Sequence, residues 1–215
     1  MIPKISKMFR RDGLFHPTKN HSLYLEKFRK LKDKKIINIG AGGHDPIPGA
    51  INVDPYREGP NTVKAFGENL PFTGESVDLA ICLATLEHVK EPQKIIAEIY
   101  RVLKPGGQIY AEVPFIQPFH AAPDDYLRLT LPGLEYLCRE FRKIDSGLSN
   151  GPGSGLAWLL VEYNQIFFRN SFLKKIAKNL TKILVSPLKY IDNWLIKKQG
   201  SANLAGGFYF FGEKK

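Results

Sequence analysis

Short apolar runs recur along the chain, and they have the length and composition of buried strands. Four lie within the first 115 residues, and a fifth lies near the end: KIINIG (35–40), AINVD (50–54), VDLAICL (77–83), GQIYAEVPF (107–115) and GFYFFGEK (207–214). β-branched and aromatic residues are frequent in these runs, as is typical of strands. Because the first and third runs are almost continuously apolar, they predict strands buried on both faces, as in a parallel sheet.

A helical pattern lies between the third and fourth runs. In EPQKIIAEIYRVLKPGG (91–107), apolar residues recur at steps of three and four. Pro92 suits the first helical turn, and Pro105-Gly106-Gly107 ends the helix. Strands that alternate with a helix of this length predict right-handed crossovers and a mainly parallel sheet.

The second half of the chain is predicted to be largely helical. LPGLEYLCREF (131–141) carries apolar residues on one helical face. Residues 154–199 read as helical, with an interruption near Pro187. The apolar segment LAWLLVEYNQIFF (156–168) is too short and too polar to predict a membrane span.

The stretch IINIGAGGHDPIPGAINVD (36–54) joins two predicted strands through a glycine cluster and leaves no room for a helix. Only six residues separate Gly43 from Ala50, and two of them are prolines. The dinucleotide-binding fingerprint needs a third glycine, where Asp45 stands here, and a helix whose N-terminus holds a pyrophosphate. The unit therefore predicts either a ligand without phosphates or a purely structural turn.

An acid at the end of the second strand indicates what such a ligand contains. The Asp54 carboxylate is able to accept two hydrogen bonds from vicinal ribose hydroxyls. Gly40 and Gly42 allow a close approach of the backbone after the first strand. These features fit an adenosine ligand without phosphates, and S-adenosylmethionine is such a ligand.

The net charge of +10 is unevenly distributed. Residues 1–35 carry +8 and residues 169–200 carry +7, whereas residues 36–168 carry −6. Basic flanks around an acidic middle indicate contact with something anionic, or simply solvated helix faces. The two cysteines are far apart in sequence, and the N-terminus has no apolar leader segment, so the sequence predicts a reduced, cytoplasmic protein.

The segment AFGENLPFTGESVDLAICLATLEHVKEPQKIIAEIYRVLKPGGQIYAEVPF (65–115) resembles the class I S-adenosylmethionine-dependent methyltransferases, in particular the methyltransferase type 11 group. The motifs that carry this resemblance are Leu70-Pro71-Phe72, Asp78, Leu86-Glu87-His88 and Arg101-Val102-Leu103-Lys104-Pro105-Gly106-Gly107. Their order along the chain is far more specific than any single motif. The resemblance extends from about Ile36 to Phe141.

The resemblance implies a Rossmann-like α/β fold with seven mainly parallel strands in the order 3-2-1-4-5-7-6. The last strand is expected to be antiparallel and to follow a C-terminal helical insertion, and the first crossover to be shortened to a loop. We expect a single methyltransferase domain with a basic helical segment (1–35), a cofactor-binding core (36–149), a helical insertion or lid (150–204) and a last strand (205–215).

The resemblance also implies which residues bind the cofactor. The glycine turn would pass under the methionine part, Asp54 would hold the ribose, and 66–68 would border the adenine. The expected set is Asn38, Gly40, Ala41, Gly42, Asp54, Phe66, Gly67, Glu68, Leu83 and Ala84. Two positions depart from the family pattern: Asn38 and Phe66 stand where the family usually or often has acids. Phe66 would either stack on adenine or belong to the core.

The loop after the predicted fifth strand, PFIQPFHAAPDDYLRLT (114–130), concentrates titratable groups beside the expected methyl-transfer site. Similar patterns occur in methyltransferases associated with surface-glycan gene clusters. His120 is the expected base for an acceptor hydroxyl, with Asp125 orienting it or binding sugar hydroxyls. Tyr126 and Arg128 would contact the acceptor. The alternatives are an exposed loop histidine and a structural ion pair between Asp125 and Arg128.

His88 in the Leu-Glu-His triplet would face the methyl-transfer site or cap the next helix. Five scattered histidines show no zinc-ligand spacing, so no metal site is predicted. The expected function is methyl transfer to a sugar, a lipid-linked acceptor or another small acceptor. An RNA or protein methyltransferase and a non-catalytic adenosine-binding module are the alternatives. The acidic middle of the chain argues against nucleic acid as a partner.

Residues 170–199 predict an amphipathic segment. Apolar residues recur at steps of three and four, with lysines largely between them. The stripe consists of Phe172, Leu173, Ile176, Leu180, Ile183, Leu184, Leu188, Ile191 and Leu195. This pattern is typical of helices that lie on an anionic membrane surface, and equally of a lid packed on the core.

Overall fold

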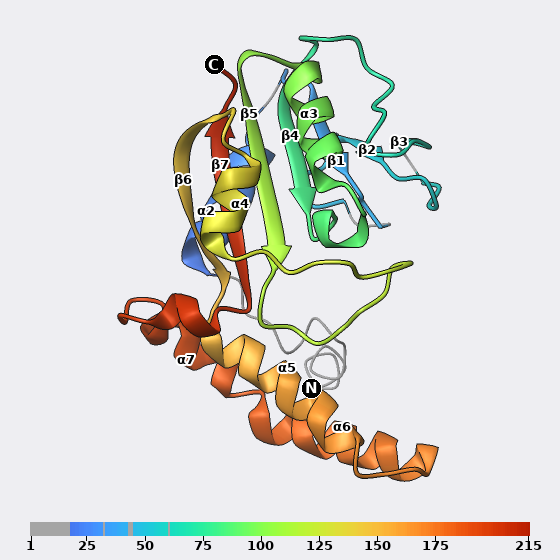
Figure 1. The fold of residues 1–215 in the computed structure, drawn as a ribbon, viewed down its shortest axis with the longest axis vertical. Helices are drawn as coiled ribbons and strands as arrows, with labels where there is room; N and C mark the ends of the chain where they lie inside the picture. The colour runs from blue at the N-terminus through green and yellow to red at the C-terminus, as the bar shows by residue number, and fades with distance from the viewer. Residues whose placement is uncertain (1–17, 32, 43–44, 60) are drawn as a thin grey trace. The chain divides into compact units, whose positions relative to one another are not determined.

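A computed structural model describes residues 18–31, 33–42, 45–59 and 61–215 (Figure 1). The chain divides into two compact units. The sheet unit comprises residues 21–114, 120–147 and 208–215. The helical unit comprises 148–207 and 115–119, together with the described residues before His21. Most of the predicted N-terminal segment, residues 1–17, lies outside the described residues.

The sheet unit is built on a seven-stranded sheet in the order β3-β2-β1-β4-β5-β7-β6. The strands are β1 (Ile36–Ile39), β2 (Ile51–Val53), β3 (Thr62–Val63), β4 (Val77–Leu83), β5 (Leu103–Pro114), β6 (Arg142–Asn150) and β7 (Gly207–Glu213). This order confirms the predicted one. The order in which the strands are added to the sheet reverses between β1 and β4, because β2 and β3 extend it on one side and β4 and β5 on the other. In such sheets ligands bind beyond the carboxyl ends of the strands at this point.

Pairing in the sheet is mainly parallel, as predicted. β1 pairs in parallel with both β2 and β4, so that Asn38 lies beside Asn52 on one side and Ile81 on the other. β4 and β5 are also parallel. The last strand runs antiparallel to β5: Gly106 N donates to Lys214 O, and Lys214 N donates to Gly107 O.

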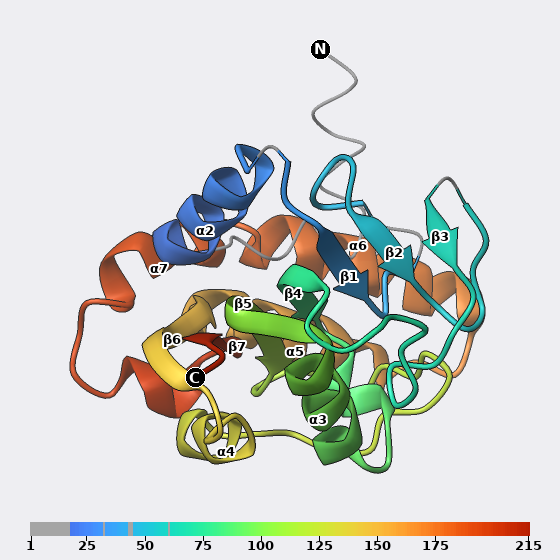
Figure 2. The ribbon, with the colours of Figure 1, turned by 90° about the horizontal axis from the view of Figure 1, so that it is seen from above.

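Helices cover both faces of the sheet (Figure 2). α2 (Lys19–Arg29) lies on one face, and α3 (Pro92–Val102) and α4 (Leu131–Leu137) lie on the other. α3 begins at Pro92, as the sequence predicts, and buries its isoleucines against the sheet. Its end differs from the prediction, because β5 starts at Leu103, before the Pro-Gly-Gly sequence.

Under α2, aromatic side chains fill the core of the sheet unit. Phe28, Tyr110, Tyr209 and Phe211 are almost fully buried, with ring centroids between 5.5 and 6.4 Å apart in the pairs that touch Tyr110. Rings packed in this way bury a large apolar area. The two cysteines are buried in the same unit and form no disulfide, and burial raises the pKa of Cys82 to about 12.

The helical unit contains α5 (Pro152–Gln165), α6 (Ser171–Val185), α7 (Leu188–Leu195) and the short η3 (Ser201–Leu204). The predicted interruption at Pro187 separates α6 from α7. The buried Asp192 carboxylate ties α7 to the start of α5 by accepting hydrogen bonds from Gly153 N, Ser154 N and Ser154 Oγ at 2.6–2.8 Å. None of the helices in the described ranges has the length and apolarity needed to cross a membrane.

Candidate active site at the carboxyl ends of the strands

The glycine turn after β1 forms without a crossover helix, as the sequence predicts. Gly40 and Gly42 have φ of +68° and +56°, a backbone conformation that side chains disfavour. The Gly40 amide donates to Val53 O at 2.9 Å, which holds the turn against the end of β2. The described residues between β1 and β2 form turns, bends and irregular backbone, with no helix among them.

The buried Asp54 carboxylate organises the loop around this turn. Its Oδ2 accepts from Gly42 N at 2.7 Å, and its Oδ1 accepts from Tyr56 N and Arg57 N, both at 2.8 Å. A carboxylate offers about four acceptor positions. Donors in the described part of the chain use three of them, which leaves one position on Oδ2 for a ligand hydroxyl, whereas the sequence predicted two hydrogen bonds to ribose.

Thr85, which follows β4, packs directly on the glycine turn. Its hydroxyl lies 3.1 Å from both Ile39 O and Leu83 O. A Cβ at Gly40 would lie 2.2 Å from Thr85 Oγ1. Gly40 is therefore needed for packing between the ends of β1 and β4 as well as for its positive φ.

Two exposed aromatic rings lie on the loops that follow β2 and β3. Phe66 is 57% exposed and Tyr56 is 64% exposed. Their ring centroids are 6.1 Å apart, with the planes nearly perpendicular. The alternative that Phe66 is a core residue is therefore wrong. An exposed aromatic face suits stacking on a planar base.

The other predicted cofactor residues line the same ends of β1, β3 and β4, with different degrees of exposure. Asn38 is buried and donates through Nδ2 to Asn52 Oδ1 at 2.9 Å. Gly67 is buried where a Cβ would meet Ile39 and Ile95 at 3.0 Å. Ala41 is buried, Glu68 and Leu83 are partly exposed, and Ala84 is exposed with φ of +49°.

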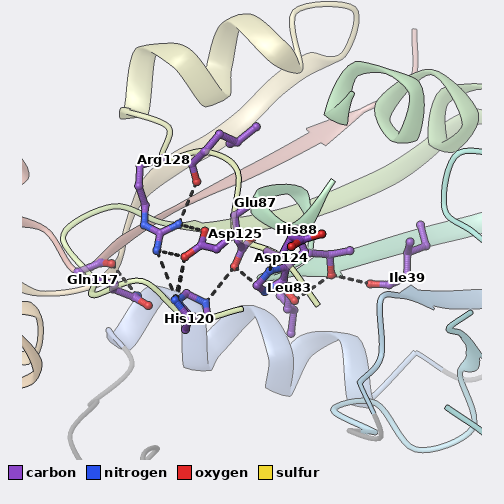
Figure 3. A network of polar contacts seen from close by, with 12 residues as sticks. Ile39, Leu83, Glu87, His88, Gln117, His120, Asp124, Asp125 and Arg128 are labelled. Atoms are coloured by element: carbon purple, nitrogen blue, oxygen red, sulfur yellow. Dashed lines mark hydrogen bonds and ion pairs between the residues drawn. The ribbon is translucent and has the colours of Figure 1, made fainter. Parts of the chain in front are cut away.

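In the loop after β5, Asp125 is the centre of a polar network (Figure 3). Its side chain is only 2% exposed, and it forms a two-pronged ion pair with the Arg128 guanidinium. It also accepts from His120 N at 2.9 Å. The hydrogen bonds from Arg128 are the main reason why the pKa of Asp125 is lowered to about 2.

These contacts bear on the acceptor-binding roles predicted for this loop. Because both terminal nitrogens of Arg128 contact Asp125, the geometry favours the structural ion pair over a sugar-binding Asp125. Tyr126 donates from its hydroxyl to Asp124 Oδ2 at 2.7 Å, which raises the pKa of Tyr126. Tyr126 as a residue remains 45% exposed and is accessible to a ligand.

Two histidines and one glutamate meet where this loop contacts η2 (Leu86–His88), the turn after β4. Glu87 Oε1 lies 3.6 Å from both His88 Nε2 and His120 Nε2. Tyr126 N donates to Glu87 O at 2.7 Å and fixes the loop against the turn. The His120 side chain is 14% exposed, so the alternative of an exposed loop histidine is wrong.

The tautomer of His88 follows from its surroundings. His88 Nδ1 lies 2.5 Å from Asp124 O, and a carbonyl oxygen only accepts. Nδ1 therefore carries a proton, and in the neutral ring Nε2 presents a lone pair toward Glu87. His120 Nδ1 lies between a donor, Arg128 Nη2 at 3.4 Å, and an acceptor, Asp125 Oδ2 at 3.7 Å.

Sequence reasoning did not assign two residues of this site. The sequence places Glu87 only within a motif, and it assigns Tyr56 no role. Glu87 and His88 are adjacent titratable residues shortly after a predicted buried strand, and this position could have indicated a site role for Glu87. Tyr56 lies two residues after Asp54, the expected ribose acid, and this position could have indicated a site role for Tyr56.

Solved structures show the class of fold. A protein from Thermotoga maritima, described as a SAM-dependent methyltransferase and possible histamine N-methyltransferase, aligns over 98% of this chain and 96% of its own. The TM-score is 0.57, and the sequence identity is 17%. At this identity the comparison shows the fold alone, which is the Rossmann-like methyltransferase fold.

Sequence comparisons show the family. The methyltransferase domain family matches residues 43–111. The ubiquinone biosynthesis O-methyltransferase of Pseudomonas fluorescens (strain Pf0-1) is 31% identical over 65% of this chain and 70% of its own length. The chain therefore belongs to the class I S-adenosylmethionine-dependent methyltransferases. The corresponding protein of Pseudomonas putida (strain GB-1) is 37% identical over 54% of this chain, which spans only 57% of that relative.

Proposed function

We propose that this protein transfers a methyl group from S-adenosylmethionine to a hydroxyl of a small acceptor. The observation that carries the proposal is the meeting of Glu87, His88 and His120 at the carboxyl ends of β4 and β5. In this fold the acceptor side of the cofactor site lies beyond these strand ends. Groups that accept a proton there suit a hydroxyl acceptor, which must lose one.

The residues around the glycine turn fit the cofactor. The open position on Asp54 Oδ2 accepts one ribose hydroxyl, and the exposed faces of Phe66 and Tyr56 offer a surface for adenine. The turn itself has no helix N-terminus, and a cofactor without phosphates needs none. Asn38 supplies an amide where the family usually has an acid.

When bound, S-adenosylmethionine supplies a methyl group that its positive sulfur already activates. The protein's part is to align the acceptor oxygen with that methyl group, which is worth roughly 7–11 kcal/mol in well-oriented reactions. The Glu87–His88–His120 cluster receives the hydroxyl and removes its proton. General base catalysis of this kind contributes about 10²–10⁴-fold.

The acceptor class is supported only broadly. The matched relatives are named for O-methylation in ubiquinone biosynthesis, which favours a small hydroxylated acceptor. A sugar or a lipid-linked molecule fits the same chemistry, and the polar loop with Tyr126 exposed beside the cluster suits hydroxyl-rich molecules. Transfer to RNA or to a protein has no comparable support.

One observation favours a lipid-linked acceptor and a peripheral membrane contact. Within the helical unit, α6 packs on α5 through the face that contains the buried Ala177 and Val185. The part of the apolar stripe that lies in α6 is on another face and remains exposed: Phe172, Leu180 and Leu184 are 68%, 56% and 78% exposed. Leu188, at the start of α7, packs instead against the core of the helical unit. We propose that this stripe, in a segment of net charge +7, contacts an anionic lipid surface.

The proposed activity is tested by incubating the protein with labelled S-adenosylmethionine and a panel of hydroxylated acceptors. The panel contains nucleotide sugars, glycolipids and prenylated phenols, with RNA and protein extracts as further arms. Label transfer to a hydroxyl acceptor supports the proposal. Tight S-adenosylhomocysteine binding without transfer to any arm would instead favour a non-catalytic adenosine-binding module.

A further inference from the structure

The Glu87 carboxylate is the most unusual polar group in the sheet unit. Its side chain is completely buried, and neither oxygen makes a hydrogen bond with any residue in the described part of the chain. Burial of a carboxylate without hydrogen bonds or a paired charge is strongly unfavourable. Such a group in a folded protein points to a positively charged partner.

The nearest groups are two imidazole nitrogens at metal-ligand spacing. One donor atom from each of Glu87, His88 and His120 lies within 4.8 Å of the other two. The two distances of 3.6 Å from Glu87 Oε1 exceed normal hydrogen-bond length. They agree with the separation of about 3.3–3.6 Å between neighbouring donors of a tetrahedral site with bonds of about 2.0–2.2 Å to zinc.

We propose that Glu87, His88 and His120 bind one divalent transition-metal ion, with Zn²⁺ as the reference ion. Two imidazoles and one carboxylate form a donor set that suits Zn²⁺, Co²⁺ and similar ions, whereas Mg²⁺ and Ca²⁺ prefer oxygen donors alone. The third separation, between the donor nitrogens of His88 and His120, is up to 4.8 Å, so these nitrogens must approach each other by about 1 Å to bind one ion. His120 lies on a loop and is able to make this movement.

The surrounding contacts orient the His88 ring for metal binding and anchor the backbone of His120. His88 uses Nδ1–H to contact Asp124 O, which leaves the Nε2 lone pair directed toward Glu87. A backbone carbonyl behind the distal nitrogen is the usual support of a metal-bound histidine. His120 is supported through its backbone amide by Asp125, which Arg128 anchors in turn.

Three protein ligands leave a coordination position for the acceptor oxygen. A bound cation lowers the pKa of a coordinated hydroxyl, as it does for water, so that the proton passes to solvent. With the cation bound, the cluster promotes loss of the acceptor proton through the metal, and His120 contributes as a ligand in place of acting as the base. This consequence depends on the proposed methyl transfer, whereas the cation binding does not.

Cation binding is tested with Co²⁺ in the absence of both cofactor and acceptor. Chelator-treated protein without a histidine tag is titrated while its visible absorption is followed. Wild type is expected to bind one equivalent with the intense absorption of four- or five-coordinate Co²⁺, and Zn²⁺ is expected to displace it. Glu87→Gln and His120→Gln are expected to weaken binding at least tenfold.

The matched controls are Glu91→Gln and His21→Gln. Glu91 is an exposed glutamate near the cluster in sequence, and His21 is paired with Glu112 and lies outside it. Both controls are expected to bind Co²⁺ as wild type does. Thermal melting with and without Zn²⁺ provides a second readout. Zn²⁺ that binds the folded state at this site is expected to raise the Tm of wild type but not that of Glu87→Gln.

Two results would overturn the proposal. One is the absence of stoichiometric Co²⁺ binding in wild type, and the other is wild-type affinity in folded Glu87→Gln and His120→Gln. NMR titration provides the same test: if Glu87 is paired with an imidazolium and its signals do not change when Co²⁺ is added, wild type does not bind the ion and the proposal is overturned. Full turnover of the metal-free protein would support the methyltransferase function while overturning the role of the cation in it.

Discussion

The carboxylate of Asp54, at the end of β2, accepts a hydrogen bond of 2.7 Å from the backbone amide of Gly42 in the turn after β1. This contact brings the predicted ribose acid to the predicted methionine turn. It also means that the acid has a structural task when no ligand is bound. A substitution at Asp54 therefore acts on both the loop and the ligand.

Asp54→Asn is expected to weaken S-adenosylhomocysteine binding by about 1.5–3 kcal/mol, the range for hydrogen bonds to a charged group. Calorimetry measures this directly. Asp45→Asn, at an exposed position in the same loop, is the matched control and is expected to leave affinity unchanged. Equal affinities for Asp54→Asn and wild type would remove Asp54 from the cofactor site.

His120→Gln is expected to reduce turnover at least about 100-fold, because the cluster loses a group that handles the acceptor proton. Its affinity for S-adenosylhomocysteine is expected to stay within about threefold of wild type. Initial rates with an identified acceptor, together with calorimetry, separate the two effects. A mutant that retains full turnover would exclude His120 from the chemistry.

The ion pair between Asp125 and Arg128 is expected to make stability depend on acidity. The pKa of Asp125 is lowered to about 2 in the folded protein. A lowered pKa contributes stability at pH values above the ordinary aspartate pKa, and this contribution is lost as the pH falls toward 2. The corresponding free energy is about 2 kcal/mol.

Urea unfolding at pH 5 and pH 2.5 compares wild type with Asp125→Asn and Asp45→Asn. Wild type and the Asp45→Asn control are expected to lose more stability on acidification than Asp125→Asn. If all three proteins lose the same free energy of unfolding, the ion pair contributes nothing to acid sensitivity.

The exposed stripe of α6 is expected to bind vesicles that contain anionic lipid. Flotation at low salt should bring wild type to the lipid fraction, and high salt or neutral lipid should reduce this recovery. Phe172→Gln combined with Leu184→Gln is expected to abolish it. Tyr136→Gln, at an exposed position in α4, is the control. Recovery of wild type in neither lipid fraction would contradict the membrane contact.

Lys182 lies among the lysines of the amphipathic segment 170–199, but it is buried and does not take part in the proposed lipid contact. Lys182 is only 5% exposed, and helical periodicity places it on the side of α6 away from the exposed stripe. Apolar periodicity alone identifies the stripe but not which face the neighbouring helix covers. In the helical unit, α5 covers the side with Ala177 and Val185.

The strands with continuous apolar runs could be predicted from the sequence, and two others could not. β3 has only two residues, Thr62 and Val63, which is too short for any period to show. β6 contains Arg142, Lys143, Asp145 and Ser146, and most of its residues remain partly or fully exposed. Such a strand is defined by pairing with its neighbour rather than by its own pattern.

The polar loop could be identified from its composition, but its internal pairing could not. Whether Asp125 contacts a ligand or Arg128 depends on a three-residue step in an irregular loop, where no period constrains side-chain direction. The cluster of Glu87, His88 and His120 could not be predicted for a similar reason. Glu87 and His88 are adjacent in sequence, whereas His120 reaches them only after β5 has returned to the same edge of the sheet.

The short connection between β1 and β2 also has a consequence for competition inside a cell. ATP and dinucleotides share the adenosine group and are abundant, so a site that recognises adenosine must discriminate against them. Their phosphates are usually stabilised by a helix N-terminus after the glycine turn, and the described part of this connection supplies none. A buried carboxylate at Asp54 repels phosphate as well. We therefore expect the loop to favour the uncharged ribose of a sulfonium nucleoside over nucleotides.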